Sequence, residues 1–550
     1  MKSPCSKMHI KAKQRGVILM IVAAVLVLAG LTMLLTMLDD TTVDAKRNQK
    51  TAEALALAKE ALIGYSVKNN NRPGSLPCPD RDNDGDADLL NGHICPAYIG
   101  RVPWKTFGLS DLRDGQGERL WYALSPNFTD SLFLSNGTTP PARVINNDTP
   151  GQIVITGSSP ASNVVAIIFS AGAVIGAQQR DSANPSAAIN NEAANFLEGE
   201  NATGGVTYTE SFLRNVDTIG DVTYQTGAAS LTFNDRLLAI SEKDLMPPIE
   251  KRIAREAKIC LDDYAASAGG KYPWAVKVAN PTVFTQLVMG QPTVSQVIVG
   301  DKDTLFGRFS ALPSTQSWAS NATVVTMQTK FAELWAAVHA FRASKTQTNY
   351  NNLLAAADPG AKDAANNVKT AYSGTALETP ADNMQIAANE AKSIALDSTN
   401  AFIDAKLQAL VNASNAFAAA FSGGNGMPGI WPTSCTLFSS GIWNHWKNFL
   451  FYQVADGFKP GGSGSCTTGT CLTINSAGAF RAVVVVAGRA LAGQSPRAPT
   501  VSPPSTYLEG INPHSGTTPP IAFETYNLSG SGYSTVNDLV LCLDAKANCK

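Results

Sequence analysis

A short acidic segment near the start of the chain has the residue types and the spacing of a calcium-binding loop. Residues 78–95 read CPDRDNDGDADLLNGHIC, in which aspartates alternate with other residues around a glycine. Ca²⁺ takes about six to eight oxygen ligands, and carboxylates at loop positions 1, 3 and 5 with glycine at position 6 can wrap around one ion. The candidate ligands are Asp80, Asp82, Asp84, Asp86, Asp88 and, at position 12, Asn91.

The same loop predicts a weak structural site. Asp86 would offer its backbone carbonyl, Asp88 would act directly or through water, and Asn91 replaces the bidentate glutamate that closes tighter loops of this kind. Five carboxylates so close together would repel one another without a cation. We therefore predict Ca²⁺ as a structural cofactor, with a solvated acidic turn as the alternative.

The cysteines predict disulfide bonds. Of nine cysteines, Cys5 precedes a long apolar segment, and eight follow it. An even number in an exported chain indicates disulfides, although eight cysteines allow about 100 pairings. Proximity in the sequence favours Cys78–Cys95, Cys466–Cys471 and Cys542–Cys549, which leaves Cys260–Cys435.

Patterns typical of enzymes are weak in this chain. A G-x-G-x-x-G string at Gly424, Gly426 and Gly429 contains Pro428, so no helix follows it to hold a phosphate. Glu198 and Glu509 occupy the same place in two similar segments, FLEGEN (196–201) and YLEGIN (507–512). They could form the carboxylate pair of a hydrolase, but a shared structural role is the simpler interpretation. His445 between Trp443 and Trp446 could form a carbohydrate platform or part of a core. We predict that the protein is not an enzyme.

Composition limits the remaining classes. The 550 residues carry 43 basic and 44 acidic side chains, which argues against a nucleic-acid partner bound by bulk positive charge. A hydrophobic content of 44% excludes a largely disordered chain. Five histidines argue against a histidine-built metal enzyme. The length predicts about three to four units.

The N-terminus predicts export. Residues 1–16 contain five basic and no acidic side chains, and residues 17–38 are uncharged. As a helix, this apolar segment would extend about 33 Å and could cross about 30 Å of hydrocarbon. The positive flank would stay in the cytoplasm, so we expect a single-pass protein of the bacterial inner membrane with its bulk in the periplasm. An apolar stripe in AEALALAKEALIGY extends the expected helix to residue 70.

The junction Lys13-Gln14-Arg15-Gly16, followed directly by Val17-Ile18-Leu19, resembles the prepilin leader of type IV pilins and type II secretion pseudopilins. The resemblance implies that a prepilin peptidase cuts after Gly16, that Val17 becomes the methylated first residue, and that other pilin or pseudopilin subunits are partners. The family usually has Glu at mature position five, where this chain has Ile21. Tip pseudopilins and PilX-like minor pilins also lack it. The alternative is a plain signal anchor.

The rest of the chain contains an internal repeat. Five pairs of segments match in the same order: 58–65 with 257–264, 121–128 with 451–458, 164–178 with 480–494, 196–201 with 507–512, and 234–235 with 537–538. Segment 101–125, RVPWKTFGLSDLRDGQGERLWYALS, also resembles pseudopilins. The repeat predicts an α+β fold with two tandem pilin-like modules, each a helix on a mostly antiparallel sheet. Two unrelated β-rich domains are the alternative.

The predicted organisation is a leader (1–16), an N-terminal helix (17–70), a first module (71–245) and a second module (246–550). A helical insertion at about 320–422 is either a partner-binding arm or a decoration. We expect a membrane-anchored, exported minor pilin or pseudopilin at the tip, or in the initiation, of a type IV pilus or type II secretion fibre. The alternative is a signal-anchored periplasmic or surface binding protein, such as an adhesin or carbohydrate-binding protein, outside any fibre.

Overall fold

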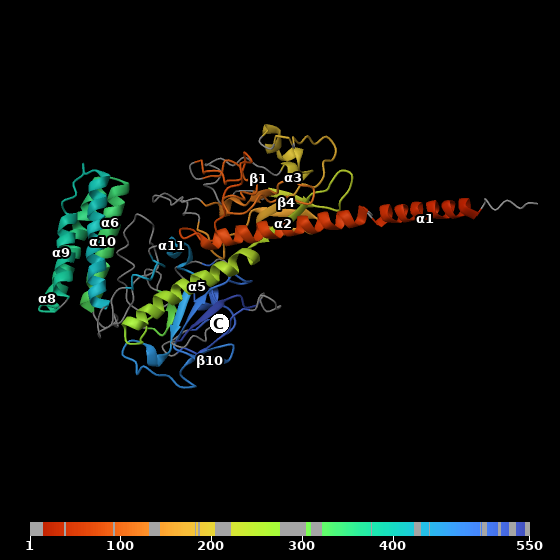
Figure 1. Ribbon diagram of the computed structural model, residues 1–550. Coiled ribbons are helices and arrows are strands. Elements are labelled where there is room, and N and C mark those ends of the chain that lie inside the picture. Colours follow the sequence, from red (N-terminus) through yellow and green to blue (C-terminus); the bar gives the residue numbers. More distant parts are fainter. Residues whose placement is uncertain are drawn as a thin grey trace, which may run out of the picture.

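The computed structural model describes most of the chain from residue 15 to residue 544. It leaves out residues 1–14, 38–39, 92–93, 131–143, 182, 185–186, 204–221, 276–303, 310–321, 376, 423–430, 439–440, 495–496, 498–502, 515–518, 527–534 and 545–550. The described part is an α+β structure with several sheets (Figure 1).

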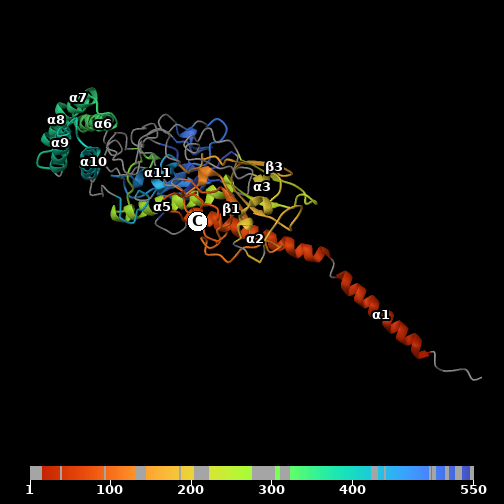
Figure 2. The ribbon, with the colours of Figure 1, turned by 90° about the horizontal axis from the view of Figure 1, so that it is seen from above.

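Two helices in sequence form the N-terminus, α1 (Arg15–Met37) and α2 (Asp40–Lys68). The predicted transmembrane span is wrong, and with it the predicted inner-membrane location, because no helix within the described residues is both long and apolar enough to cross a membrane. Together α1 and α2 cover the predicted helix over 17–70 up to Lys68, apart from residues 38–39, which lie outside the described residues (Figure 2).

The first sheet has six strands around a long central one. Its order is β1 (Ile99–Arg101), β2 (Trp121–Leu124), β4 (Ala161–Ser170), β3 (Ile153–Gly157) and β5 (Val222–Thr226), with β6 (Arg236–Ser241) also paired to β4. The run VVAIIFS in β4 is buried, as expected for an apolar, β-branched central strand. The sheet is mostly antiparallel, as predicted, and β3 and β5 form its one parallel pair within the described residues.

The second sheet is antiparallel and has four strands in the order β13 (Leu539–Leu543), β11 (Ala482–Val486), β8 (Leu450–Val454) and β7 (Phe306–Arg308). A small three-stranded sheet beside it consists of β10 (Ala477–Phe480), β9 (Leu472–Ile474) and β12 (Ala522–Phe523). Short helices complete both regions: η1 (Pro126–Phe128), η2 (Ala188–Asn191), η3 (Ala193–Asn195), α3 (Glu200–Thr203), α11 (Ile442–Trp446), η9 (Asp456–Phe458) and η10 (Pro504–Thr506).

The two sheets share one register. Equivalent cross-strand partners are Arg101–Trp121 and Arg308–Phe451 at the first pair of strands, Trp121–Phe169 and Phe451–Val485 at the second, and Phe169–Leu237 and Val485–Val540 at the third. The sequence repeat aligns Trp121 with Phe451 and Phe169 with Val485, whereas Arg101 and Arg308 lie outside the matched segments. Four strands of the first sheet (β1, β2, β4 and β6) therefore have the same order as the four strands of the second, and β3 and β5 have no counterpart among the described residues of that sheet.

Helix α5 (Glu242–Ser267) joins the two regions. Ser241 caps its start, because the Ser241 side chain and the Asp244 carboxylate bond each other's backbone N–H groups. The buried side of the helix, which includes Leu245, Ile249 and Ile253, follows helical spacing. The helix contacts both sheets and lies against α2, and one hydrophobic core includes residues from both sheets (Figure 1).

The insertion is a bundle with its own core. It consists of α6 (Ala322–Ala343), α7 (Gln347–Ala355), the π-helical turn η7 (Ala356–Ala361), α8 (Lys362–Ala371), α9 (Glu378–Ala391) and α10 (Asn400–Ser422). Its buried side chains form a cluster separate from that of the sheets. The bundle projects from one end of the molecule, opposite to α1 (Figures 1 and 2).

Candidate functional site

The acidic loop lies at the edge of the first sheet. The Cys78–Cys95 disulfide closes it, with Cα atoms 5.4 Å apart, and Asp80 exchanges backbone hydrogen bonds with Arg101 of β1. Gly85 has a φ of +94°, and a Cβ atom there would lie 2.7 Å from the Trp104 ring. Only glycine fits this position without strain. The loop is therefore held by a disulfide, a strand and a tight turn.

The structure brings together three of the six predicted ligands. Carboxylate oxygens of Asp80, Asp82 and Asp88 lie within 4.8 Å of one another. Asp84 instead accepts a hydrogen bond from the backbone N–H of Asp86 at 2.8 Å. The Asp86 carboxylate lies 3.8 Å from Lys105 Nζ, and Asn91 exchanges backbone hydrogen bonds with Ile94.

Burial makes this cluster electrostatically unfavourable. Burial raises the pKa of Asp80 to about 6, in spite of hydrogen bonds from the backbone of Gly85 and Asn83, and the negative charges of Asp84 and Asp82 add to the increase. Burial also raises the pKa of Asp88, and Arg81 opposes this change.

One carboxylate oxygen of the cluster lacks a hydrogen bond. Oδ2 of Asp88 is buried and accepts none, and the nearest cationic atom, Arg81 Nε, is 3.5 Å away. A buried oxygen of this kind is costly unless a cation or water completes its surroundings. The three carboxylates therefore fit a hard cation, which would need further ligands from backbone carbonyls or water.

The disulfide predictions are confirmed for three pairs. Besides Cys78–Cys95, the structure contains Cys260–Cys435, which ties α5 to the segment after the bundle, and Cys466–Cys471. Cys542 is also disulfide-bonded, and its predicted partner Cys549 lies outside the described residues.

The first of the two matched glutamates bonds the backbone of its own module. Oε2 of Glu198 accepts hydrogen bonds from the N–H groups of Asn234 and Asp235 at 2.9 and 3.1 Å. Oδ2 of Asp235 accepts in turn from Glu198 N at 2.9 Å and from Asn201 at 3.0 Å. Burial raises the pKa of Asp235 to about 8, so its carboxyl is largely protonated at neutral pH.

The second glutamate repeats this arrangement. Oε2 of Glu509 accepts from Asn537 N at 3.2 Å, and Oδ2 of Asp538 accepts from Glu509 N and Asn512, both at 2.9 Å. Burial and the neighbouring Glu509 raise the pKa of Asp538 far above its usual range. Each glutamate thus closes a loop within its own module, which favours the structural interpretation over a catalytic pair.

The aromatic cluster around His445 lies inside the molecule. Trp443, His445 and Trp446 are all buried, so they do not form an exposed platform for a sugar. Nδ1 of His445 accepts a hydrogen bond from Ile145 N at 3.1 Å, and burial lowers its pKa to about 3, with Arg72 adding to the effect. This histidine connects the second module to a loop of the first.

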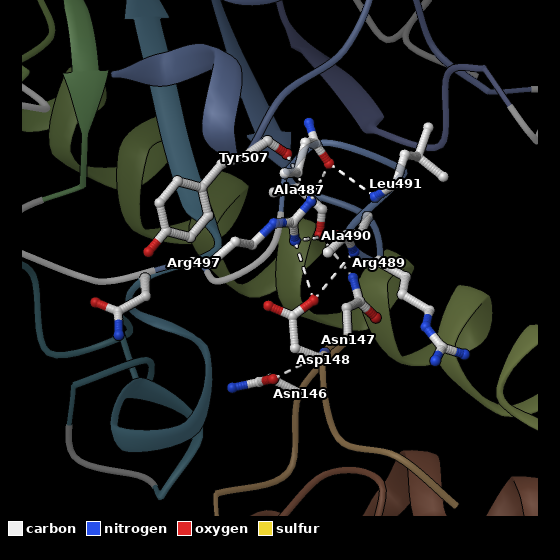
Figure 3. A network of polar contacts seen from close by, with 12 residues as sticks. Asn146, Asn147, Asp148, Ala487, Arg489, Ala490, Leu491, Arg497 and Tyr507 are labelled. Atoms are coloured by element: carbon white, nitrogen blue, oxygen red, sulfur yellow. Dashed lines mark hydrogen bonds and ion pairs between the residues drawn. The ribbon is translucent and has the colours of Figure 1, made fainter. Parts of the chain in front are cut away.

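The same loop makes further polar contacts across the two modules (Figure 3). Asn147 donates to the carbonyl of Ala487 at 2.6 Å, and Asp148 accepts from Ala490 N at 3.0 Å. Arg497 lies 3.3 Å from the Asp148 carboxylate. These partners are more than 300 residues apart in sequence, so no local pattern could have predicted them.

The predicted processing site and the glycine string lie wholly or partly outside the described residues. Gly16 and Val17 belong to the backbone of α1, and the leader before them, residues 1–14, lies outside the described residues. The glycines at 424, 426 and 429 fall in the segment 423–430, which is also outside them.

No family model, curated protein or solved structure matches this chain.

Proposed function

We propose that this protein is an exported structural subunit of the minor pilin or pseudopilin type, in a type IV pilus or a type II secretion fibre. The observation that carries the proposal is the basic leader that ends in Gly16, with the apolar run starting at Val17. Helix α1 contains this junction, and α2 continues from it along the first sheet (Figure 1). The disulfides support export to an oxidising compartment.

A position at the tip, or in initiation, suits the shape and the sequence. Two sheet modules and a projecting bundle follow the N-terminal helices (Figure 2). Such a large head would collide with its neighbours if it were repeated along a helical filament. The chain also has Ile21 where the resembling family usually has the glutamate that matches a neighbouring subunit. Both features favour a subunit present in few copies, with other pilins or pseudopilins as partners.

The acidic loop would serve this role as a structural calcium site. Asp80, Asp82 and Asp88 would hold the ion, which would neutralise their mutual repulsion. It would also contact Oδ2 of Asp88, which is buried and accepts no hydrogen bond. The ion would fix the loop against β1, and no reaction is assigned to it.

Mass spectrometry of the protein purified from its native host tests the fibre role. We expect an N-terminus at Val17 that carries a methyl group, since prepilin peptidase would have cut after Gly16. We also expect the protein in sheared fibre preparations. An intact leader together with absence from sheared fibres would contradict the proposal and favour a surface binding protein that never enters a fibre.

A further inference from the structure

Four arginines line a cavity in the first module. Its volume is about 160 Å³, equivalent to about five water molecules at roughly 30 Å³ each. Sites for drug-sized ligands begin at about 300 Å³, so only a small molecule or a single functional group fits. The arginines are Arg101 of β1, Arg113 and Arg119 of the turn before β2, and Arg180 of the loop after β4.

Positive charge exceeds negative charge around this cavity. Its acidic lining residues are Glu118 and Asp181, two against four arginines. Asp111, outside the lining, pairs with Arg113 at 2.7 Å and with Arg119 at 2.9 Å. Glu118 lies 3.5 Å from Arg180, so among the four arginines Arg101 is the one without an ion pair within the described residues, although the charge of Asp80 also acts on it.

Arg101 is the most deeply buried of these arginines. This side chain is 3% exposed, and its guanidinium lies 4.0 Å from the centres of both the Trp121 and Phe196 rings. Nη1 donates to the carbonyl of Arg119 at 2.8 Å and Nη2 to that of Asn190 at 3.1 Å, while Nε donates no hydrogen bond.

Burial opposes the charge of Arg101. It lowers the pKa of Arg101 to about 9, an effect that the charge of Glu118 opposes most, while the charges of Arg180 and Arg119 add to it and that of Asp80 opposes it. Within the described residues no carboxylate is within ion-pair distance of Arg101. A buried cation with an unused N–H donor and cationic neighbours is stabilised by an anion.

The second module shows that this charge is not a requirement of the fold. Arg308 lies between Phe451 and Tyr507, at 4.9 and 4.6 Å from their ring centres, as Arg101 lies between Trp121 and Phe196. In the shared register, however, Phe449 takes the position of Arg119. Before β8 the second module has helix α11 and not the turn that carries Arg113. Arg180 does have a counterpart, because Arg497 donates to the carbonyls of Thr506, Gly488 and Tyr507 as Arg180 does to those of Asn195, Gly172 and Phe196. Arg113 and Arg119 are therefore the two cavity arginines that belong to the first module alone.

We propose that this cavity binds a small oxyanion (phosphate, sulfate or a carboxylate) through N–H donors of Arg101, Arg113 and Arg119. Guanidinium groups suit such ligands because their planar donors match the spacing of two oxygens. The site adds a binding activity to the turn 113–119 and does not depend on the proposed fibre role.

Isothermal titration of the full-length chain tests the proposal, with sodium phosphate, sulfate and acetate as probes at constant ionic strength in calcium-free buffer. We expect saturable binding of at least one probe. Tighter phosphate or sulfate binding would assign a tetrahedral anion, and tighter acetate binding would assign a carboxylate. Arg113→Gln should weaken the preferred probe about tenfold, as expected for the loss of one charged hydrogen bond.

Matched variants separate a site from general attraction. Arg81→Gln removes the same charge from the neighbouring acidic loop, outside the cavity lining, and should change affinity less than about twofold. Glu118→Gln removes a negative charge from the lining and should tighten binding about threefold or more, a gain that a purely structural role would not produce. Hydrogen exchange of β2 and β4 checks that each variant is folded. The proposal is overturned if no probe saturates, or if Arg113→Gln and Arg81→Gln weaken binding equally.

Discussion

The two sheet modules have the same skeleton and differ in what is attached to it. In each, an arginine of the first strand lies between two aromatic rings, and a tyrosine of the next strand (Tyr122 or Tyr452) donates its hydroxyl hydrogen to a proline carbonyl. The first module adds the acidic loop and the arginine-lined cavity, and the second adds the helical bundle. Parts present twice are explained by stability, so the parts present once are the better candidates for function.

The largest expected difference between the modules concerns their disulfides. Cys260–Cys435 spans 175 residues and Cys78–Cys95 spans 17. By loop entropy, replacing the first pair with alanines should cost about 5 kcal/mol of unfolding free energy, and replacing the second about 3 kcal/mol. Urea denaturation of the two double variants measures both values. Equal losses would show that strain or residual structure in the unfolded chain, rather than loop length, sets the stabilisation.

The duplicated aspartates should respond alike. Asp235→Ala and Asp538→Ala each leave a backbone N–H and an asparagine side chain without their acceptor. We expect each substitution to cost about 3 kcal/mol, because unsatisfied buried donors are expensive. Asp→Asn at either position is the control and should cost much less, since its carbonyl oxygen still accepts and it resembles the protonated acid. Hydrogen exchange measured separately in β4 and β11 would detect a module that does not follow this rule.

Calcium should affect only the first module. With calcium in about thirtyfold excess over its Kd, binding should add about 2 kcal/mol and raise the melting temperature of the first module by about 5 °C. Asp82→Asn should abolish this increase. Asp84→Asn removes the same charge at a carboxylate outside the cluster and should preserve most of it. A calcium response that both variants retain would rule out the site.

The smallest expected effect is the change in unfolding free energy over one pH unit. Burial raises the pKa of Asp235 to about 8, above its value in the unfolded chain, so the folded state binds more protons between about pH 4 and pH 8. The contribution of this group to stability is therefore present below pH 4 and is lost as the pH rises through 8. The slope is at most about 1.4 kcal/mol per pH unit. Asp235→Asn should make the urea midpoint depend less on pH between pH 5 and pH 8. A pH dependence equal to that of the unsubstituted protein would contradict the assigned pKa.

Several features could be predicted from the sequence because they depend on local spacing or on repetition. The cysteines at 78 and 95 are near neighbours along the chain, and once the local pairs were assigned, Cys260 and Cys435 remained. The sequence repeat aligned Glu198 with Glu509, and the two side chains accept equivalent hydrogen bonds in their own modules. The spacing of the acidic loop predicted a group of carboxylates near a tight glycine turn at Gly85.

Other features were decided by the tertiary structure. All five alternating aspartates fit the spacing of a calcium-binding loop, but the fold brings only the carboxylates of Asp80, Asp82 and Asp88 together. The Asp84 carboxylate instead accepts a hydrogen bond from the backbone of its own loop. The apolar run after Gly16 predicted a membrane span that the described helices do not support.

The sequence by itself determined the duplication, the disulfide chemistry and the composition of the acidic loop, because each is a matter of residue type and spacing. Tertiary structure alone decided that His445 joins the modules instead of forming a surface platform. It also decided that Arg180, in the loop after β4, lines one cavity with Arg101 and Arg113 of the segment 101–125. Such contacts follow from how the sheet brings remote strands and loops together, and no short stretch of sequence contains that information.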